Sequence, residues 1–322
     1  MTLILVAGKV HEDGLALLRA RAGVRVEAMA SLGPADFIAR LPEATALLIR
    51  TAPVPAEAIE RAKLLRIVSR HGVGYDNLPM DTLTARGIPV TVIGNAGSVA
   101  VAEHALMLML ALAKRVMPFD RAVRAGAWDE RNILVPGDLE GHTVLILGLG
   151  RIGREVARRA AAFDMRVLAY DPAFGPGTRL PVDVRPVADW RSALREADFV
   201  TLHLPRSPET EGMIGAAELA AMKPSAFLIN TSRGGLIDET ALAEALARGT
   251  IAGAGIDTLD AEPPPADHPL LGSDRVILSP HIGGLSANAA RRLSLAAAAN
   301  VLAAFDGTLD PAMVVNKDVL KR

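Results

Sequence analysis

The sequence contains no cysteine. This absence excludes disulfide bonds, thiolate metal sites and cysteine nucleophiles, and it fits a reducing, cytoplasmic location. The sequence also lacks an excess of charge of either sign, because 35 basic residues balance 36 acidic ones. We therefore expect neither nucleic acid nor an anionic membrane surface as a binding partner.

Long apolar runs are missing as well. The two longest, around residues 105–113 and 295–305, are too short to span a bilayer and are flanked by charges. The first eight residues are apolar but have no basic start and no small-residue cleavage site, and Lys9, His11 and Glu12 follow closely. We interpret this segment as a first strand and not as a signal peptide, and we expect a soluble protein.

The chain does contain a regular alternation of short β-rich runs and helix-like stretches. The runs of the first series cover residues 3–7, 24–28, 46–50, 65–69 and 90–93, with helical pattern at 14–21, 35–41, 56–62 and 80–86. A second series of strands covers residues 143–147, 165–171, 198–204, 226–231, 251–257 and 275–279. Such alternation predicts an α/β fold of two doubly wound parallel-sheet domains.

Two long helical stretches lie where the two series meet. Residues 98–117 form an uninterrupted helical pattern with Ser98 as a possible N-cap, and residues 288–305 form an alanine-rich one. A chain of 322 residues can hold two ordinary domains. We predict that the second domain, 99–284, is inserted in a discontinuous first domain made of residues 1–98 and 285–322.

A glycine-rich turn opens the second domain. Gly148, Gly150 and Gly153 follow the apolar run 143–147 and precede the helical stretch 154–163. In dinucleotide-binding proteins the first glycine makes the tight turn, the second lets the backbone approach a pyrophosphate, and the third lets the helix pack on the strand. This context favours a dinucleotide site, and the alternative is an ordinary tight strand-to-helix turn.

Asp171 ends the next apolar strand. A carboxylate there can accept hydrogen bonds from both ribose hydroxyls and would repel an added 2′-phosphate, which favours NAD over NADP as the cofactor. The alternative is a solvent-exposed aspartate at the end of a strand.

Three later strands are each followed by a polar side chain that could do chemistry: Arg233, Glu262 and His281. Ligands of open parallel sheets bind at the carboxyl ends of the strands, so these side chains could converge beside a nicotinamide. Histidine can exchange a proton with a keto oxygen near neutral pH, a carboxylate can orient the imidazole, and arginine can hold a substrate carboxylate. Taken singly, they could equally be a surface charge, a loop acid and a core histidine.

The chain resembles the D-isomer-specific 2-hydroxyacid dehydrogenase family over nearly its whole length. The matching motifs run from Arg70 to Asn77, Asn95 to Leu106, Gly148 to Gly153, Asn230 to Gly235, Asp257 to Pro263 and Pro280 to Gly284. The resemblance implies a Rossmann NAD-binding domain inserted in a flavodoxin-like substrate domain. It also implies a homodimer packed through the region of residues 98–117.

The resemblance further implies roles for individual residues. Arg233, Glu262 and His281 match the catalytic triad of the family, and Arg233 would also meet the substrate. The backbone N–H groups of Val73 and Gly74 would bind the substrate carboxylate, and Asn95 would border the substrate. The residues expected to contact NAD are Gly148, Gly150, Arg151, Ile152, Gly153, Asp171, Thr231, Asp257 and Gly284.

Within the family, the likeness is greatest to the 3-phosphoglycerate dehydrogenases, in a short form without the regulatory domain of longer members. Arg70 occupies the place of an arginine that meets the substrate phosphate in that group, and Arg131 could add a second charge from a neighbouring subunit. His71 and Val73 depart from the pattern of that group. The alternative for Arg70 is a strand-end arginine paired with a nearby acid.

The sequence therefore predicts an NAD-dependent D-2-hydroxyacid dehydrogenase acting on a small 2-keto or 2-hydroxy acid, possibly one with a distal anion as in 3-phosphoglycerate. The alternatives are a glyoxylate/hydroxypyruvate reductase and an NAD-sensing binding protein similar to the co-repressors of this family. The remaining histidines have no His-x-His or HExxH spacing, so no metal site is predicted.

Overall fold

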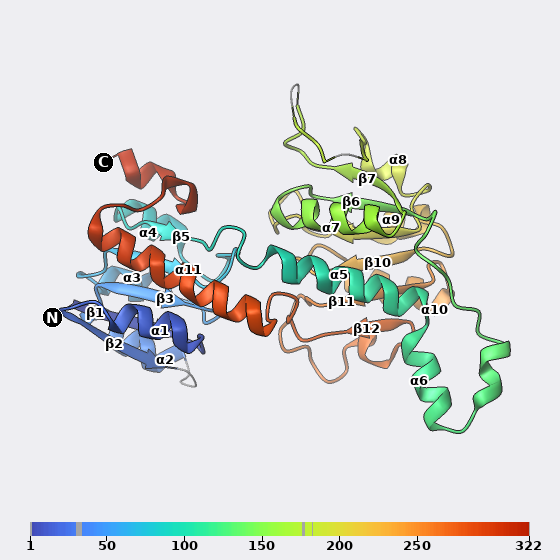
Figure 1. Ribbon diagram of the computed structural model, residues 1–322, viewed down its shortest axis with the longest axis horizontal. Coiled ribbons are helices and arrows are strands. Elements are labelled where there is room, and N and C mark those ends of the chain that lie inside the picture. Colours follow the sequence, from blue (N-terminus) through green and yellow to red (C-terminus); the bar gives the residue numbers. More distant parts are fainter. Residues whose placement is uncertain (1, 30–33, 176–177, 182, 322) are drawn as a thin grey trace. The chain divides into compact units, whose positions relative to one another are not determined.

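The computed structural model describes residues 2–29, 34–175, 178–181 and 183–321. The chain forms two compact units, of which the first, unit 1, comprises Met1–Gly97 and Leu285–Arg322. The second, unit 2, comprises Ser98–Gly284 (Figure 1). Unit 2 is thus inserted in the sequence of unit 1.

Unit 1 contains a five-stranded parallel sheet with the order β2-β1-β3-β4-β5. The strands are β1 Thr2–Ala7, β2 Val24–Met29, β3 Ala46–Ile49, β4 Ile67–Arg70 and β5 Val90–Thr91. The helices are α1 Glu12–Arg19, α2 Pro34–Arg40, α3 Ala56–Arg61, α4 Met80–Ala85 and α11 Ala287–Asp306. Helices α2, α3 and α4 contribute to one buried cluster, while α1 and α11 pack on each other and α11 lies against β3 and β4. This strand order is the flavodoxin-like one.

Unit 2 contains a seven-stranded sheet with the order β12-β11-β10-β9-β6-β7-β8, parallel throughout. Its strands are β6 Thr143–Leu147, β7 Arg166–Tyr170, β8 Val184–Pro186, β9 Phe199–Leu202, β10 Phe227–Asn230, β11 Gly253–Ile256 and β12 Val276–Leu278. The strand order reverses between β6 and β9, which is the switch point at which Rossmann folds bind dinucleotides. The predicted α/β class with two doubly wound parallel sheets is confirmed.

Helices cover both faces of this sheet (Figure 1). They are α5 Ser98–Ala113, α7 Arg151–Ala162, α8 Trp190–Ala193, α9 Ala216–Ala221 and α10 Glu239–Arg248, while a further helix, α6 Val116–Arg124, buries none of its residues. Helices α5 and α7 share one buried cluster with the sheet, and α8, α9 and α10 share the other. The carboxyl ends of the strands therefore lie between two helical layers, and the loops that follow them are held on both sides.

The prediction of one uninterrupted helix over residues 98–117 is wrong. Helix α5 ends at Ala113, and α6 begins at Val116 after Arg115, whose φ of 52° is left-handed. Pro118 explains the break, because in a continuous helix its ring would clash with the carbonyl of Lys114. In the first turn of a new helix, its missing N–H costs nothing. Ser98 is the first residue of α5 instead of its cap, and its hydroxyl has no partner among the described residues.

The sequence also failed to indicate strand β8, Val184–Pro186, which lies at the edge of the larger sheet beside β7. The strand has three residues and includes a proline, which is tolerated only at such an edge. A strand this short has too little alternation to be recognised. Among the described residues, no helix has both the length and the apolar character needed to cross a membrane.

Two histidines, the buried His71 and the partly buried His203, are uncharged at neutral pH. Burial, with smaller contributions from the charges of Arg50 and Arg70, lowers the pKa of His71 from 6.5 to about 4. Burial alone lowers the pKa of His203 from 6.5 to about 3. The unfolded chain therefore binds protons at both histidines between about pH 6.5 and pH 4, where the folded chain does not.

We expect the free energy of unfolding to fall as the pH falls below 6.5. At pH 5 each of the two histidines should cost about 2 kcal/mol, because one pKa unit corresponds to about 1.4 kcal/mol. Urea unfolding at pH 7 and pH 5 measures this loss. His203→Gln should lose about 2 kcal/mol less between the two pH values than the wild type, and an equal loss in both proteins would contradict the assignment.

Candidate functional site

The glycine-rich loop of unit 2 connects β6 to α7, and two of its glycines are required by close contacts. Gly148 has a φ of 96°, and a Cβ there would lie 2.6 Å from the carbonyl oxygen of His203. A Cβ on Gly153 would lie 2.0 Å from the carbonyl oxygen of Gly148. No side chain fits at either position, so these glycines bring the start of α7 against the sheet.

The middle glycine of this loop faces open space. A Cβ on Gly150 would meet no atom within 4 Å. In the described part of the chain, the N–H groups of Gly150, Arg151 and Ile152 donate to no protein acceptor. Free N–H groups at a helix N-terminus form an anion site. The loop therefore fits the pyrophosphate of a dinucleotide.

Asp171 follows β7 directly and is fixed against the glycine-rich loop. Its Oδ2 accepts a hydrogen bond from the N–H of Leu149 at 2.8 Å, and its Oδ1 accepts one from the N–H of Ala173 at 2.9 Å. Each carboxylate oxygen can accept a further hydrogen bond. The position thus suits the ribose hydroxyls of a dinucleotide and disfavours a 2′-phosphate.

Thr231 and Gly284 are two further residues of unit 2 that the sequence predicts to contact a dinucleotide. Thr231 follows β10, is only 6% exposed, and its hydroxyl has no partner among the described residues. An unpaired buried hydroxyl at a strand end is a polar group that a ligand could satisfy. Gly284 is half-buried, and it is the last residue of unit 2.

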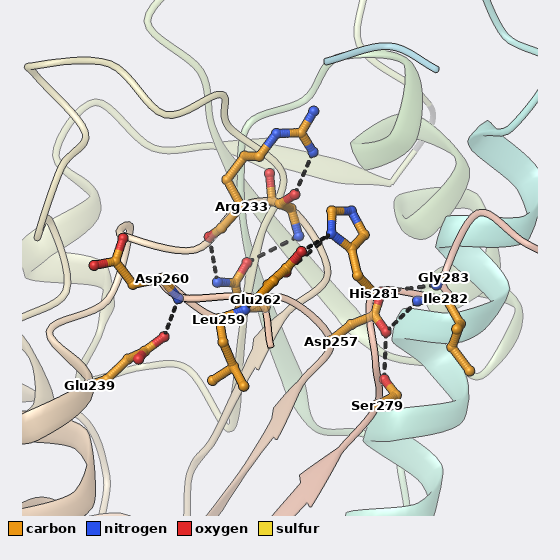
Figure 2. Close-up of polar contacts among 12 residues, drawn as sticks. Arg233, Glu239, Asp257, Leu259, Asp260, Glu262, Ser279, His281, Ile282 and Gly283 are labelled. Carbon is orange, nitrogen blue, oxygen red and sulfur yellow. Dashed lines mark hydrogen bonds and ion pairs between the residues drawn. The ribbon is translucent and has the colours of Figure 1, made fainter. Parts of the chain in front are cut away.

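The buried carboxylate of Asp257 organises the loop that contains His281. It accepts hydrogen bonds from the hydroxyl of Ser279 at 2.5 Å and from the N–H groups of Ile282 and Gly283 at 2.9 and 2.8 Å (Figure 2). The Nε2 atom of His104, on α5, lies 3.4 Å from the same carboxylate. Burial would raise the pKa of Asp257, but these donors outweigh burial and hold it below its usual value.

His281 and Glu262 form a hydrogen-bonded pair at the carboxyl edge of the sheet. The Nδ1 atom of His281 lies 2.8 Å from Oε2 and 3.1 Å from Oε1 of Glu262 (Figure 2). The backbone of His281 is left-handed, with a φ of 52°, and its N–H donates to the carbonyl of Asp257 at 2.8 Å. Because a carboxylate only accepts, Nδ1 carries the hydrogen and Nε2 faces away from Glu262.

The loop that contains Glu262 is held from three sides. A Cβ on Gly234 would lie 2.0 Å from the carbonyl oxygen of Leu259, so the loops after β10 and β11 touch through their backbones. Glu239 of α10 accepts a hydrogen bond from the N–H of Asp260 at 2.8 Å. Arg206, from the loop after β9, donates to the carboxylate of Asp260 at 2.7 Å.

Arg233 lies on the loop after β10, beside the Glu262 loop (Figure 2). The side chain of Asn230 donates to the carbonyl of Arg233 at 2.8 Å and accepts from the N–H of Ser232 at 3.0 Å, which fixes the turn. The guanidinium of Arg233 donates to the carbonyl of Ser232 at 2.7 Å. The structure thus joins His281 directly to Glu262 and places Arg233 on an adjacent loop of the same unit.

The predicted substrate residues Arg70, Val73, Gly74 and Asn95 all belong to unit 1. Arg70 ends β4, and its guanidinium donates to the side chain of Asn77 at 3.2 Å and to the carbonyl of Ile49 at 3.4 Å. Within the described residues, the N–H groups of Val73 and Gly74 donate to no protein acceptor. Asn95 is exposed in the turn before α5.

Sequence reasoning missed several residues that support these loops. His104 bonds Ser279 at 2.8 Å, and His268 bonds Glu239 at 2.8 Å. Each contact joins residues that are distant in sequence, 175 positions apart for His104 and Ser279 and 29 for His268 and Glu239, so no local pattern indicates these roles. Arg50 was missed as well, although its place after β3, next to the β4 strand that Arg70 ends, could have been inferred from the carboxyl-end rule.

Comparison with known proteins places these features in context. The family profile described as "D-isomer specific 2-hydroxyacid dehydrogenase, NAD binding domain" matches residues 106–283. The D-3-phosphoglycerate dehydrogenase of Archaeoglobus fulgidus is 37% identical over 300 residues, which cover 93% of this chain and 56% of the relative. The chain therefore spans little more than half the length of this relative.

Two other relatives match at full length or nearly so. The glyoxylate reductase of Korarchaeum cryptofilum is 41% identical over 289 residues, covering 88% of this chain and 86% of the relative. The crystal structure of the TT0316 protein from Thermus thermophilus has a TM-score of 0.88 and 36% sequence identity. That similarity covers 98% of this chain and 100% of the other.

The glycine-rich loop offers a matched pair of substitutions. Gly153→Ala should lower the free energy of unfolding by about 1–3 kcal/mol, because its Cβ overlaps a carbonyl oxygen. Gly150→Ala should leave that free energy unchanged to within about 0.5 kcal/mol and should weaken NADH binding at least tenfold, since its Cβ occupies the open space. Urea unfolding and fluorescence titration with NADH measure the two effects. Unaltered NADH affinity in Gly150→Ala would show that no pyrophosphate approaches this glycine.

Proposed function

Because the chain belongs to the D-isomer specific 2-hydroxyacid dehydrogenase family and contains its NAD-binding domain, we propose that it is an NAD-dependent D-2-hydroxyacid dehydrogenase. The observation that supports this most directly is the hydrogen-bonded pair of His281 and Glu262. The pair follows two strands of the sheet whose glycine-rich loop fits a pyrophosphate.

NAD bound by unit 2 would accept or donate the hydride of the reaction. We assign its pyrophosphate to the N–H groups after Gly150, near the exposed side chain of Arg151, and its adenosine ribose to Asp171. The segments of Thr231, Asp257 and Gly284 would border the nicotinamide end. The carboxylate at position 171 supports NAD over NADP.

His281 is the acid–base residue of the proposed mechanism. When a 2-hydroxy acid is oxidised, its C2 loses a hydride and its hydroxyl loses a proton, and Nε2 of His281 takes that proton. Glu262 holds Nδ1, so the imidazole keeps one orientation and its positive charge is balanced after the transfer. In the reverse direction, Nε2 returns the proton to the keto oxygen. Arg233 binds the substrate carboxylate and polarises the neighbouring carbonyl.

We assign the other predicted substrate contacts to unit 1, residues 1–97 and 285–322. The N–H groups of Val73 and Gly74 have no protein acceptor among the described residues and would bind the substrate carboxylate. Asn95 is exposed in the segment that follows strand β5 of the same unit. Two backbone donors without protein acceptors are what an oxyanion or carboxylate requires.

We further propose that the substrate has a phosphate or a sulfonate at its far end. Arg70 is the last residue of β4, and Arg50 comes directly after the neighbouring strand β3, so both lie at the carboxyl edge of the sheet. The positive charges of both guanidinium groups contribute to the low pKa of His71. Arginine binds phosphate oxygens in a bidentate manner. Arg131, which stacks on the Trp128 ring at 5.5 Å, is exposed and could supply a further charge to a neighbouring subunit.

The test is NADH oxidation, followed by absorbance, against hydroxypyruvate, phosphohydroxypyruvate, glyoxylate, pyruvate and sulfopyruvate. We expect the phosphate- or sulfonate-bearing acids to have the highest kcat/KM, and Arg70→Ala to lower it by about 10- to 100-fold for these two alone. Arg61→Ala, at an exposed arginine of α3, is the matched control.

The panel also separates the alternatives. Activity on the short acids alone would make the protein a glyoxylate/hydroxypyruvate reductase and would remove the distal anion site. Tight NADH binding without reduction of any keto acid would favour an NAD-sensing protein and contradict the proposed activity.

Replacing the acid–base residue tests the mechanism. His281→Ala should lower kcat on the order of 100-fold or more, because the keto oxygen loses its proton donor. NADH affinity should remain, since His281 follows β12, whereas the proposed pyrophosphate site lies on the glycine-rich loop after β6. His142→Ala, at an exposed histidine of the same unit, is the control. Steady-state kinetics with equal kcat in the two variants would remove His281 from the mechanism.

We also propose that the protein is a cytoplasmic homodimer. Helix α6 buries none of its residues, and it stands away from the sheet of unit 2 (Figure 1). The apolar side chains exposed in this region are Met107, Val116, Met117, Val123, Trp128, Ile133 and Val135. Seven exposed apolar side chains within one region are typical of a subunit interface. A second copy of the chain covers it in the proposed dimer.

Light scattering tests the dimer. Ile133 and Val135 are 72% and 75% exposed, and replacing both with aspartate should halve the mass in solution, because charges do not tolerate burial in an apolar interface. Leu64→Asp, at a residue of unit 1 that is 58% exposed, should leave the mass unchanged. A wild-type protein of monomer mass would overturn the proposal.

A further inference from the structure

Ser294 of helix α11 is a buried hydrogen-bonding centre in unit 1. Its hydroxyl accepts a hydrogen bond from the N–H of His11 at 2.8 Å and donates one to the carbonyl of Ala290 at 2.8 Å. Its Oγ also lies 2.9 Å from Nε2 of His71. Since the only hydrogen of the hydroxyl goes to Ala290, Nε2 of His71 must be the donor.

His71 is therefore held at both its backbone and its side chain. The residue is 6% exposed, its N–H donates to the carbonyl of Ile49 at 2.8 Å, and its ring donates to Ser294. The low pKa of His71, which burial causes together with the charges of Arg50 and Arg70, keeps this ring neutral. A neutral imidazole with its hydrogen on Nε2 is a single, fixed donor.

The residues after His71 have few other restraints. In the described part of the chain, the N–H groups of Val73 and Gly74 have no protein acceptor, and the carbonyl of Gly72 accepts only a long bond of 3.4 Å from Ile93. Further along the chain, Asn77 donates to the carbonyl of Ala52 at 2.7 Å. The position of residues 72–74 therefore depends on the attachment immediately before them.

Helix α11 fixes a second predicted substrate segment in the same way. Arg292 donates to the carbonyl of Ala96, next to Asn95, at 3.1 Å, and Asn300 donates to the carbonyl of Val92 at 3.0 Å. Helix α11 thus holds both predicted substrate segments, the one that begins at His71 and the one around Asn95, through polar side chains.

We propose that His71, through its hydrogen bond to Ser294, is a positioning residue that sets the affinity for the substrate carboxylate by fixing the 72–74 loop on helix α11. This inference rests on the proposed function, in which the N–H groups of Val73 and Gly74 bind that carboxylate. His71 touches neither substrate nor cofactor in this proposal, so its effect falls on substrate binding and not on chemistry.

The experiment compares His71→Ala, Ser294→Ala and His71→Gln with Ser69→Ala. Ser69→Ala is the matched control, because the buried Ser69 hydroxyl also joins β4 to α11, donating to the carbonyl of Ala297 at 2.9 Å, but lies before the loop. We expect KM for the preferred keto acid to rise about tenfold in the two alanine variants at saturating NADH, with kcat within about threefold. His71→Gln, which keeps an Nε2 donor, should recover most of the affinity.

A second readout does not require turnover. The amide NMR signals of Val73 and Gly74 should shift or broaden in His71→Ala and Ser294→Ala, stay as in the wild type in Ser69→Ala, and return in His71→Gln. If the wild type reduces no keto acid, the proposed function fails, and these signals alone decide whether the loop is positioned by His71. Unchanged KM and unchanged amide signals in folded Ser294→Ala would overturn the inference.

Discussion

The burial of the Asp257 carboxylate is the constraint on which the loop that contains His281 depends. A carboxylate that is 2% exposed must be satisfied by donors, since an unpaired buried charge would cost several kcal/mol. The donors are Ser279 and the N–H groups of Ile282 and Gly283, and they can reach it only if the chain turns sharply at His281. The left-handed backbone of His281 follows from this requirement. The direction of its ring, toward Glu262, follows from the turn.

The positions of the catalytic candidates could be predicted from the sequence because parallel strands leave little freedom. Arg233, Glu262 and His281 each follow a strand of one sheet, so their loops meet at one edge whatever the details of packing. The contact of His281 with Glu262 needed more than this rule. It depends on Gly234 passing against the backbone of Leu259, a contact between loops 25 residues apart that no local pattern records.

The sequence-based predictions missed the break between helices α5 and α6 and the role of His104. The helix break at Arg115 was missed because residues 98–117 show an uninterrupted helical pattern, whereas the ring of Pro118 acts on the carbonyl four residues earlier in the chain. His104 sits in a helix with no feature to distinguish it from other half-buried histidines, and its role depends on Ser279 reaching it from the last strand. Local propensity predicts elements, but supporting contacts between distant segments arise only when the fold is complete.

The two units solve opposite electrostatic problems with buried titratable groups. In unit 2, the negative charge of Asp257 is kept, and donors from three segments hold its pKa low. In unit 1, burial, together with smaller contributions from the charges of Arg50 and Arg70, disfavours the protonated imidazole of His71 and lowers its pKa. The imidazole stays neutral instead, so it can serve as a fixed hydrogen-bond donor while the two arginines keep the edge of the sheet positive. A charged side chain at position 71 would have to move to solvent, and the loop that follows would move with it. The neutrality of His71 thus allows the imidazole to stay buried, while Arg50 and Arg70 supply the positive charge at this edge of the sheet.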